Sequence, residues 1–482
     1  MRIALLLPRF DGPSFMTDLE PINLGYLAAF IEQHSSHDVQ LRIQPQRARD
    51  REFIDGLDFD LIGLSVYSAN LRASRMLTGI VKSKNRKVVI GGPLPTGMPM
   101  IVSETGADFA VIGEGEHTFL DLLQWLEHPD RDLKTLPGLA YEDEEGRLVT
   151  TKPRPRIGNM DSLPFPRRDF VPSLRQNSMQ TTFVFGSRGV CVVPLYFSRG
   201  CLFSCPYCLS SKQWSRNWQS RSPENLLAEM DRLASERNTR HFMFLDADTN
   251  GNPAKSEALY DILTRRNYQW MCETSPVYLS REILDLMQRA GCRGIFLGLE
   301  SGVGKTQEWI GKGLDGAVSM TATLENIAYM EKLGIKCTAA FLIGLPGDSK
   351  RTLRENRAYV RKVKATMCWF SYAHPYPGTT LYQIALERGW IAPDDPLERL
   401  GSTASPSIPT EYLTVSELKR QFWVTSLTFF LGFHFLSNML RIIRRNPVNL
   451  VMFLSIGFLI IRLTTGGFIN RLRSVLDSSR HS

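Results

Sequence analysis

The sequence predicts an α/β protein with three parts: an N-terminal doubly wound parallel sheet, a partial (β/α)6 TIM-like barrel and a C-terminal helical segment. Two separate blocks alternate short apolar runs with helical patterns, which is typical of parallel sheets. A proline-rich stretch without periodicity lies between the blocks, and the alternation stops after Ile391. We therefore expect a first domain over 1–150, a linker over 151–190, the barrel over 191–391 and a helical region over 392–482.

The composition is that of an ordinary globular protein. The chain has 482 residues, of which 43% are hydrophobic and 22% charged, enough for several domains with cores of their own. The net charge is +8, but nine Lys and Arg against three Asp and Glu in 411–482 supply most of it, so we expect no nucleic-acid partner. No signal-peptide cleavage site follows the apolar run after Met1, and scattered cysteines suit a reducing compartment, so the expected location is cytoplasmic.

Five strands are expected in the first block, at 2–8, 38–43, 60–67, 87–92 and 108–113. Doubly wound parallel sheets bind ligands at the carboxyl ends of their strands. Three of those ends carry the loops "SVYSAN", "GGPLPTG" and "GEGEH", whose backbone could approach a ligand closely. The alternative interpretation of each loop is a tight turn between a strand and a helix. No G-x-G-x-x-G follows the first strand, so a nicotinamide-dinucleotide domain is not expected.

Six strand–helix units are expected in the second block, with strands within 192–200, 241–248, 269–275, 293–300, 336–346 and 368–378. In such barrels function lies at the carboxyl ends of the strands. The stretch "SRGCLFSCPYCLSS" follows the first of these strands and places Cys201, Cys205 and Cys208 at the spacing C-x3-C-x2-C. We therefore expect the reactive centre in this loop.

Two metal sites could use these three cysteines. A structural zinc site would need Cys191 as its fourth ligand, because such sites are closed and four-coordinate. Cys191 precedes the strand, however, and is expected at the opposite end of the barrel. An iron–sulfur cluster held by only three cysteines leaves one iron open to a substrate or cofactor, and we favour that interpretation.

The three-cysteine loop after the first strand of a six-unit barrel resembles the radical S-adenosylmethionine (SAM) superfamily, over about 194–391. The resemblance implies a [4Fe–4S] cluster on Cys201, Cys205 and Cys208, with SAM at the open iron. It also implies SAM-binding roles at the matching motifs "PYC", "FLDAD", "GLESG" and "FLIGLPGDS". The residues concerned are Tyr207, Asp246, Glu300, Gly344 and Pro346. The alternative for Glu300 is a solvated carboxylate at a strand end.

The first block, with "PINLGYLAAFIE", "DLIGLSVYSAN", "VVIGGPLPT" and "DFAVIGEGEHTF", resembles the cobalamin-binding domain of one large radical SAM branch. The resemblance implies cobalamin contacts from the three loops, at Ser65, Tyr67, Asn70, Gly91, Gly92, Gly113, Glu114 and Gly115. The motif D-x-H-x-x-G, whose His coordinates cobalt, is absent. The lower face of cobalt would then carry no protein ligand, or a side chain such as Tyr67 or Asn70. A domain that no longer binds cobalamin is the remaining alternative.

The resemblance implies an enzyme that cleaves SAM reductively to a 5′-deoxyadenosyl radical. With methylcobalamin, the implied reaction is C-methylation of an unactivated carbon. The alternatives are an enzyme that uses the same cofactors for cyclisation, oxidation or rearrangement, and a non-catalytic regulatory protein. The implied partners are a small-molecule or lipid-like substrate and an electron donor such as flavodoxin or ferredoxin.

The C-terminal region is basic and strongly apolar. Thr414 is a plausible helix N-cap with Glu417 as its capping-box partner. Two apolar runs, over 422–436 and 448–461, flank the basic stretch "RIIRRNP", and the second is too short to span a bilayer. The alternatives are helices that cover the barrel, an anchor peripheral to the inner face of the membrane, or a re-entrant hairpin.

Overall fold

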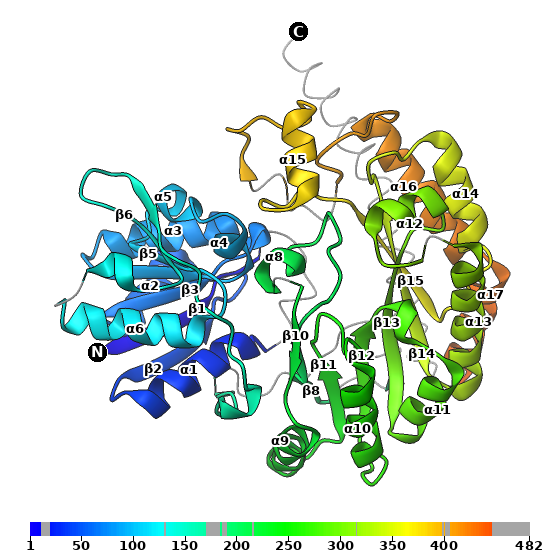
Figure 1. The fold of residues 1–482 in the computed structure, drawn as a ribbon, viewed down its shortest axis with the longest axis horizontal. Coiled ribbons are helices and arrows are strands. Elements are labelled where there is room, and N and C mark those ends of the chain that lie inside the picture. Colours follow the sequence, from blue (N-terminus) through cyan, green and yellow to red (C-terminus); the bar gives the residue numbers. More distant parts are fainter. Residues whose placement is uncertain are drawn as a thin grey trace.

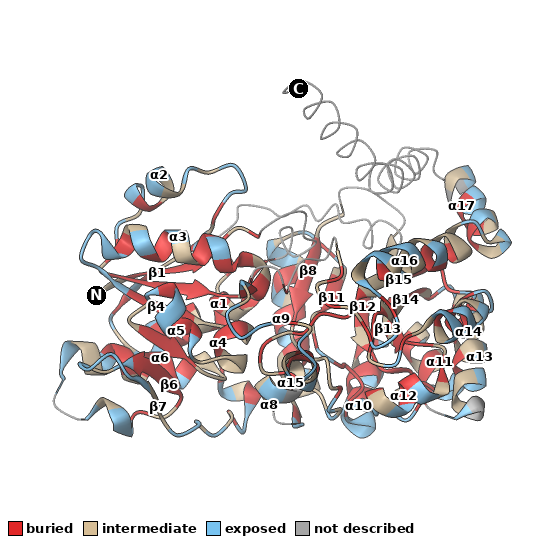
Figure 2. Ribbon diagram, turned by 90° about the horizontal axis from the view of Figure 1, so that it is seen from above, coloured by how far each residue is buried: buried red, intermediate tan, exposed pale blue. Residues whose placement is uncertain are grey.

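The computed structural model describes residues 1–10, 20–129, 132–169, 184–185, 190–214, 216–314, 316–397, 400 and 405–445. Two sheets form two lobes that lie side by side, the first in blue to cyan and the second in green to yellow (Figure 1). Figure 2 shows that the central strands of both sheets are largely buried and that the helices around them have exposed outer faces. Both predicted α/β layers are therefore present.

The first sheet has seven strands in the order β2-β1-β3-β4-β5-β6-β7. These are β1 (Arg2–Leu7), β2 (Asp38–Ile43), β3 (Leu61–Ser65), β4 (Lys87–Gly91), β5 (Phe109–Val111), β6 (Leu139–Glu142) and β7 (Leu148–Thr150). The five predicted strands pair in parallel, whereas β6 and β7 add an antiparallel edge. The sequence analysis missed this hairpin because its strands have only four and three residues.

Helices cover both faces of the first sheet, as a doubly wound fold requires. They are α1 (Ile22–His34), α2 (Asp50–Asp55), α3 (Leu71–Lys82), α4 (Pro93–Gly97), α5 (Ile101–Thr105) and α6 (Gly115–Glu127). α1 packs with α6, while α3 packs with α2 and α5. In the order 2-1-3-4-5 of the parallel strands, successive strands are added on opposite sides of the pair β1 and β3. The loops at the carboxyl ends of β3, β4 and β5 therefore gather at one edge of the sheet.

The second sheet has six parallel strands in the order β15-β14-β13-β12-β11-β8. They are β8 (Val192–Leu195), β11 (His241–Phe244), β12 (Gln269–Thr274), β13 (Cys292–Glu300), β14 (Lys336–Ile343) and β15 (Met367–Tyr372). Among the described strands, β8 and β15 do not pair with each other, so the barrel is open. A short ribbon of β9 (Ser198–Gly200) and β10 (Trp218–Ser220) was not predicted.

The barrel helices begin where a short polar side chain caps them. The helices that follow strands are α9 (Pro223–Glu236), α10 (Pro253–Leu263), α11 (Arg281–Arg289), α13 (Ala317–Leu333), α14 (Lys350–Val360) and α15 (Thr380–Glu387), with α8 (Ser210–Trp214) and α12 (Gly304–Ile310) between them. Five of these helices are capped by a side chain that accepts a bond from the amide three residues on: Ser222, Asn252, Ser280, Ser349 and Thr379.

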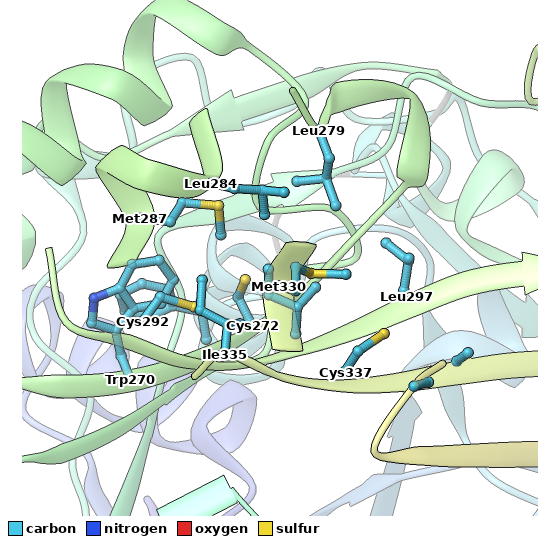
Figure 3. Packing of buried hydrophobic residues seen from close by; sticks show 14 of the residues in the cluster. Trp270, Cys272, Leu279, Leu284, Met287, Cys292, Leu297, Met330, Ile335 and Cys337 are labelled. Atoms are coloured by element: carbon cyan, nitrogen blue, oxygen red, sulfur yellow. The ribbon is translucent and has the colours of Figure 1, made fainter. Parts of the chain in front are cut away.

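The core of the second lobe contains most of the scattered cysteines. Cys272, Cys292 and Cys337 lie among Trp270, Met330 and other apolar side chains (Figure 3). Each of the three is at most 1% exposed, and Cys368 belongs to the same core at 2%. Buried thiols of this kind act as small apolar side chains, which separates them from the cysteines of the loop after β8.

The linker is built into the boundary between the lobes. Arg168 lies 2.7 Å from Glu20 of the first domain and 3.0 Å from Glu229 of α9. Arg221 also pairs with Glu229, and all four side chains are buried. Breaking such a network leaves a buried charge without a partner, so these contacts stabilise one arrangement of the lobes.

The C-terminal helix α16 (Val415–Phe430) begins at the predicted capping box of Thr414 and Glu417. It packs against β14, β15 and α14, and α17 (Phe433–Arg445) follows it. Phe429 and Phe435 join the barrel core, so packing accounts for much of the first apolar run. The second run, over 448–461, lies outside the described residues. No described helix is long and apolar enough to cross a membrane.

Candidate active site between the two lobes

The cysteine loop leaves the barrel through a turn that requires glycine. Gly200, the last residue of β9, has φ +109°. A Cβ at this position would lie 1.8 Å from the carbonyl oxygen of Asn217, so no side chain fits. The chain therefore enters Cys201 in one fixed backbone conformation.

The three cysteines of this loop lie near one another at the barrel mouth. Cys205 is buried, Cys201 and Cys208 are half-buried, and the Cys208 amide donates to the Cys205 carbonyl at 3.0 Å. Burial raises the pKa of Cys201 to about 11 and that of Cys205 to about 12. These thiols therefore need a strong positive charge beside them, such as a cluster iron, in order to ionise.

The donor set of the loop can be compared with the needs of a zinc ion and of a cluster. Cys201, Cys205 and Cys208 supply three thiols. A structural zinc ion needs four protein ligands, whereas a cluster held by three thiolates keeps one iron open. This donor set therefore fits a cluster.

Glu300 and Tyr207 meet beside the cysteine loop. Glu300 ends β13 with φ +64°, and the pairing of β13 with β14 shifts register between Gly298 and Glu300. Its carboxylate lies 2.6 Å from the ammonium of Lys312. Burial raises the pKa of Tyr207 well above its usual value, and the nearby Glu300 carboxylate raises it further. The structure thus brings together two residues of the predicted SAM site.

Lys312 is a residue of this site that sequence reasoning missed. It stands between Gly311 and Gly313, which have φ +74° and +75°. Burial lowers the pKa of Lys312, but the charge of Glu300 and the sulfur of Cys205 outweigh that effect, so the net pKa is raised. The available signal was "GKG", a lysine between two glycines, shortly after "GLESG". Lys312 supplies a fixed positive charge next to the cysteines.

Asp246 holds the segment that leads to the cysteines. Its two carboxylate oxygens accept bonds from the amides of Phe197 and Ser198, at 3.0 and 3.1 Å, and from the Ser198 hydroxyl at 2.8 Å. Burial raises the pKa of Asp246 to about 7, while these hydrogen bonds lower it. Its carboxylate therefore positions the cysteine loop, and its side chain also lines a cavity.

The turn after β14 contains the predicted residues Gly344 and Pro346. Gly344 has φ +92°, and its amide donates to the carboxylate of Asp348 at 2.9 Å. The Leu345 amide donates to the same oxygen at 3.2 Å. This carboxylate fixes the turn at the barrel mouth, and neither Gly344 nor Pro346 lines the cavity between the lobes.

That cavity, of about 300 Å³, lies between the carboxyl ends of the first sheet and the start of the cysteine loop. From the first domain it is lined by seven of the predicted residues: Ser65, Tyr67, Gly91, Gly92, Gly113, Glu114 and Gly115. A Cβ at Gly92, which has φ +109°, would lie 3.1 Å from the Val66 carbonyl oxygen. A Cβ at Gly115 would make ordinary van der Waals contacts, the nearest at 3.7 Å to Val111. This glycine-lined hollow fits a large planar cofactor that approaches the backbone.

Asn70 does not share the cavity with the other predicted residues. It is fully buried, its side-chain oxygen accepts from the Tyr67 amide at 2.7 Å, and its amide group donates to the Ser65 carbonyl at 3.0 Å. Asn70 therefore fixes the turn after β3. The described residues that line the cavity include no histidine.

Charged contacts hold the loop after β5 against the cysteine loop. Arg199, two residues before Cys201, lies 3.0 Å from Glu114 and 2.7 Å from Glu116 at the start of α6. Arg156 of the linker donates to the Arg199 carbonyl at 3.2 Å. Glu114 lines the cavity, but its carboxylate pairs with Arg199 in this network. The sequence analysis did not predict this role.

Comparison with protein families decides the identity of both lobes. The model of the radical SAM superfamily matches residues 195–360, and the model of the B12 binding domain matches residues 10–123. The chain contains a radical SAM domain and a B12-binding domain. Its cofactors are therefore a [4Fe–4S] cluster, SAM and cobalamin. As an enzyme of this class, it has the donor set and the cavity that these cofactors need.

Proteins named for different activities are similar to this chain. It is 28% identical to the uncharacterized methyltransferase PH0819 of Pyrococcus horikoshii, over 89% of this chain and 93% of that relative. It is 23% identical to the anaerobic magnesium-protoporphyrin IX monomethyl ester cyclase of Rubrivivax gelatinosus, over 80% and 70%. Its fold is similar to that of the methyltransferase TsrM from Kitasatospora setae, at a TM-score of 0.66 and 19% identity, covering 87% and 85%.

Proposed function

We propose that this radical SAM protein is a cobalamin-dependent methyltransferase that acts on an unactivated carbon of a small molecule. One observation carries the proposal: a single cavity is lined both by the loops after β3, β4 and β5 and by Ser198–Gly200, directly before Cys201. A substrate in that cavity would lie between the two cofactors. In the proposed reaction, the radical derived from SAM and the methyl group of cobalamin must both reach the same carbon of the substrate.

The bound cofactors would supply a hydrogen-abstracting 5′-deoxyadenosyl radical and a transferable methyl group. The residues of the chain hold and enclose them. Cys201, Cys205 and Cys208 would carry the cluster, and Glu300, held by Lys312, would contact SAM. The position of the cavity between the two lobes would limit the access of water to reactive species.

A close approach of backbones supports a shared site. A Cβ at Gly97, the last residue of α4, would lie 2.6 Å from the Pro377 carbonyl oxygen and 2.9 Å from the Leu209 side chain. Leu209 follows the last cluster cysteine, and Pro377 follows β15. The end of α4 therefore contacts two loops of the barrel mouth directly, which would keep the corrin and the cluster at a fixed separation.

A second candidate uses the same cofactors without methyl transfer. The similarity to the magnesium-protoporphyrin IX monomethyl ester cyclase of Rubrivivax gelatinosus favours ring formation as this alternative. Both candidates need a small-molecule substrate and one-electron reduction of the cluster, for which flavodoxin or ferredoxin would serve as the donor.

The test uses anaerobically reconstituted protein with cobalamin, a reductant and SAM that carries a deuterated methyl group. We expect deuterated methylcobalamin and 5′-deoxyadenosine, and a deuterated methyl group on one component of a small-molecule extract of the source cells. A product that lacks the label and has lost two hydrogens would instead support cyclisation. Absence of both SAM-derived products would exclude either activity.

A further inference from the structure

The cavity between the lobes contains one carboxylate without a partner in the part of the chain that the structure describes. Glu273, the penultimate residue of β12, lines this cavity from the barrel side. Its side chain has neither a hydrogen bond nor an ion pair there. The other acidic groups of the cavity are engaged: Glu114 and Glu116 pair with Arg199, and Asp246 accepts bonds from the β9 segment.

The charges around Glu273 favour a positive ligand group. Burial raises the pKa of Glu273 to about 7, the carboxylates of Asp246, Asp248 and Glu300 raise it as well, and Lys312 lowers it. Lys312 is already paired with Glu300 at 2.6 Å. An unpaired carboxylate inside a protein costs free energy until a cation or hydrogen-bond donor meets it. A cationic group at this point of the cavity would remove that cost.

We propose that Glu273 binds a protonated amine of the substrate. The inference rests on the proposed function, because it takes this cavity as the place where the substrate lies. An anionic group would be repelled by Glu273 itself, and a purely apolar group would leave Glu273 unpaired. The substrate class is therefore a small molecule with a basic nitrogen.

SAM itself carries an ammonium group, which is a second source of the same chemistry. Glu300 and its neighbours at the end of β13 lie beside the cysteines, where SAM would be held. Glu273 instead lines the cavity that it shares with the first domain. We therefore assign the amine to the substrate and let the experiment separate the two sources.

The experiment compares two probes of equal shape on the protein loaded with cluster and cobalamin. The probes are 2-phenylethylamine, which is cationic, and 2-phenylethanol, which is neutral. Isothermal titration should show that the wild-type protein binds the amine at least about tenfold more tightly than the alcohol, as expected for a hydrogen bond between charged groups. Glu273→Gln should abolish the preference. Glu236→Gln, an equal change of charge at the exposed end of α9, should retain it.

An infrared measurement supplies a second readout. At about pH 6, the Glu273 carboxyl should be largely protonated and give a band that Glu273→Gln lacks. Binding of the amine should remove this band, because the ion pair stabilises the carboxylate, whereas the alcohol should leave it in place. A band that persists at saturating amine contradicts the inference.

The remaining outcomes separate this inference from the proposed function. An amine preference that survives Glu273→Gln, or that is absent from wild-type protein, overturns the role of Glu273 alone. A tenfold loss of SAM affinity in Glu273→Gln overturns it as well, because the partner is then the SAM ammonium. If wild-type protein binds no cobalamin and cleaves no SAM, the proposed function fails and the inference falls with it.

Discussion

The ammonium of Lys312 lies 2.6 Å from a carboxylate oxygen of Glu300, and both side chains are nearly buried beside the cysteine loop. A Cβ at Gly298 would lie 2.6 Å from that carboxylate and 3.0 Å from the ammonium, so glycine leaves room for the pair. The positive φ of Glu300 is a strained conformation that persists only where the surrounding structure enforces it. The surrounding backbone therefore holds this ion pair in place at the barrel mouth.

Lys312→Met should destabilise the protein by about 3 kcal/mol, because it leaves the Glu300 carboxylate buried without its partner. The double variant Lys312→Met with Glu300→Gln should recover most of that loss. Urea unfolding of the single and double variants measures both effects. Equilibrium dialysis with SAM should nevertheless show about tenfold weaker binding by the double variant, since Glu300 contacts SAM in the proposed site. Wild-type affinity in the double variant would remove Glu300 from the SAM site.

Changing Cys201, Cys205 or Cys208 to Ala should abolish the cluster and SAM cleavage, because in the proposed site each thiolate would bind a different iron. Iron and sulfide analysis after anaerobic reconstitution, together with chromatography for 5′-deoxyadenosine, measures both losses. The matched control is Cys191→Ala, which precedes β8 at the opposite end of the barrel and should retain about four irons. Stoichiometric zinc in strictly anaerobic wild-type preparations would contradict the cluster.

Gly115→Ala should weaken cobalamin binding about tenfold without destabilising the protein, because its Cβ has room in the structure but would occupy the cavity wall. Gly79→Ala is the control, since nothing lies within 4 Å of a Cβ at that helical position. Binding is measured by spectral titration and stability by thermal unfolding. Equal cobalamin affinity in both variants would show that the backbone at Gly115 does not approach the corrin.

Cobalt bound as Co(II) should carry no axial nitrogen from a protein imidazole, because no histidine is among the described residues that line the cavity. Electron paramagnetic resonance of the Co(II) form detects such a nitrogen through its hyperfine splitting. Tyr67 lines the cavity, so Tyr67→Phe tests whether its side chain affects this spectrum, whereas the Asn70 side chain already bonds to the backbone. A nitrogen splitting in wild-type protein would contradict this prediction.

The stability of the protein should fall between about pH 6.5 and pH 4 through His374. Burial lowers the pKa of His374 from 6.5 to about 4, and its Nε2 has no hydrogen-bond partner in the described chain. The unfolded chain therefore binds this proton more readily, so the folded state loses stability as pH falls through this window, by as much as ~3 kcal/mol. His374→Gln should flatten this dependence in unfolding experiments at pH values across the window. An unchanged slope would show that other groups cause the acid sensitivity.

Much of the fold follows from local sequence. The apolar runs at Arg2–Leu7 and Lys87–Gly91 have the length and bounding turns of buried strands, and the capping box of Thr414 and Glu417 starts α16 as predicted. The β6–β7 hairpin was missed because short edge strands carry little periodic signal. The pattern of three cysteines after β8 needed no structure to be recognised, since its spacing within one loop is itself the signal.

The sequence by itself determined the two sheets and the cysteine loop, because periodicity and motif spacing are local properties of the chain, and the resemblance of its motifs to a known family implied the cofactors. Only the tertiary structure decided which side chains meet. Arg199 pairs with Glu116, 83 positions earlier, and Lys312 reaches Glu300 because two left-handed glycines and a shift in strand register direct it there. Glu273 is the clearest case. Whether a carboxylate is paired depends on everything packed around it in space, and no pattern along the chain records that.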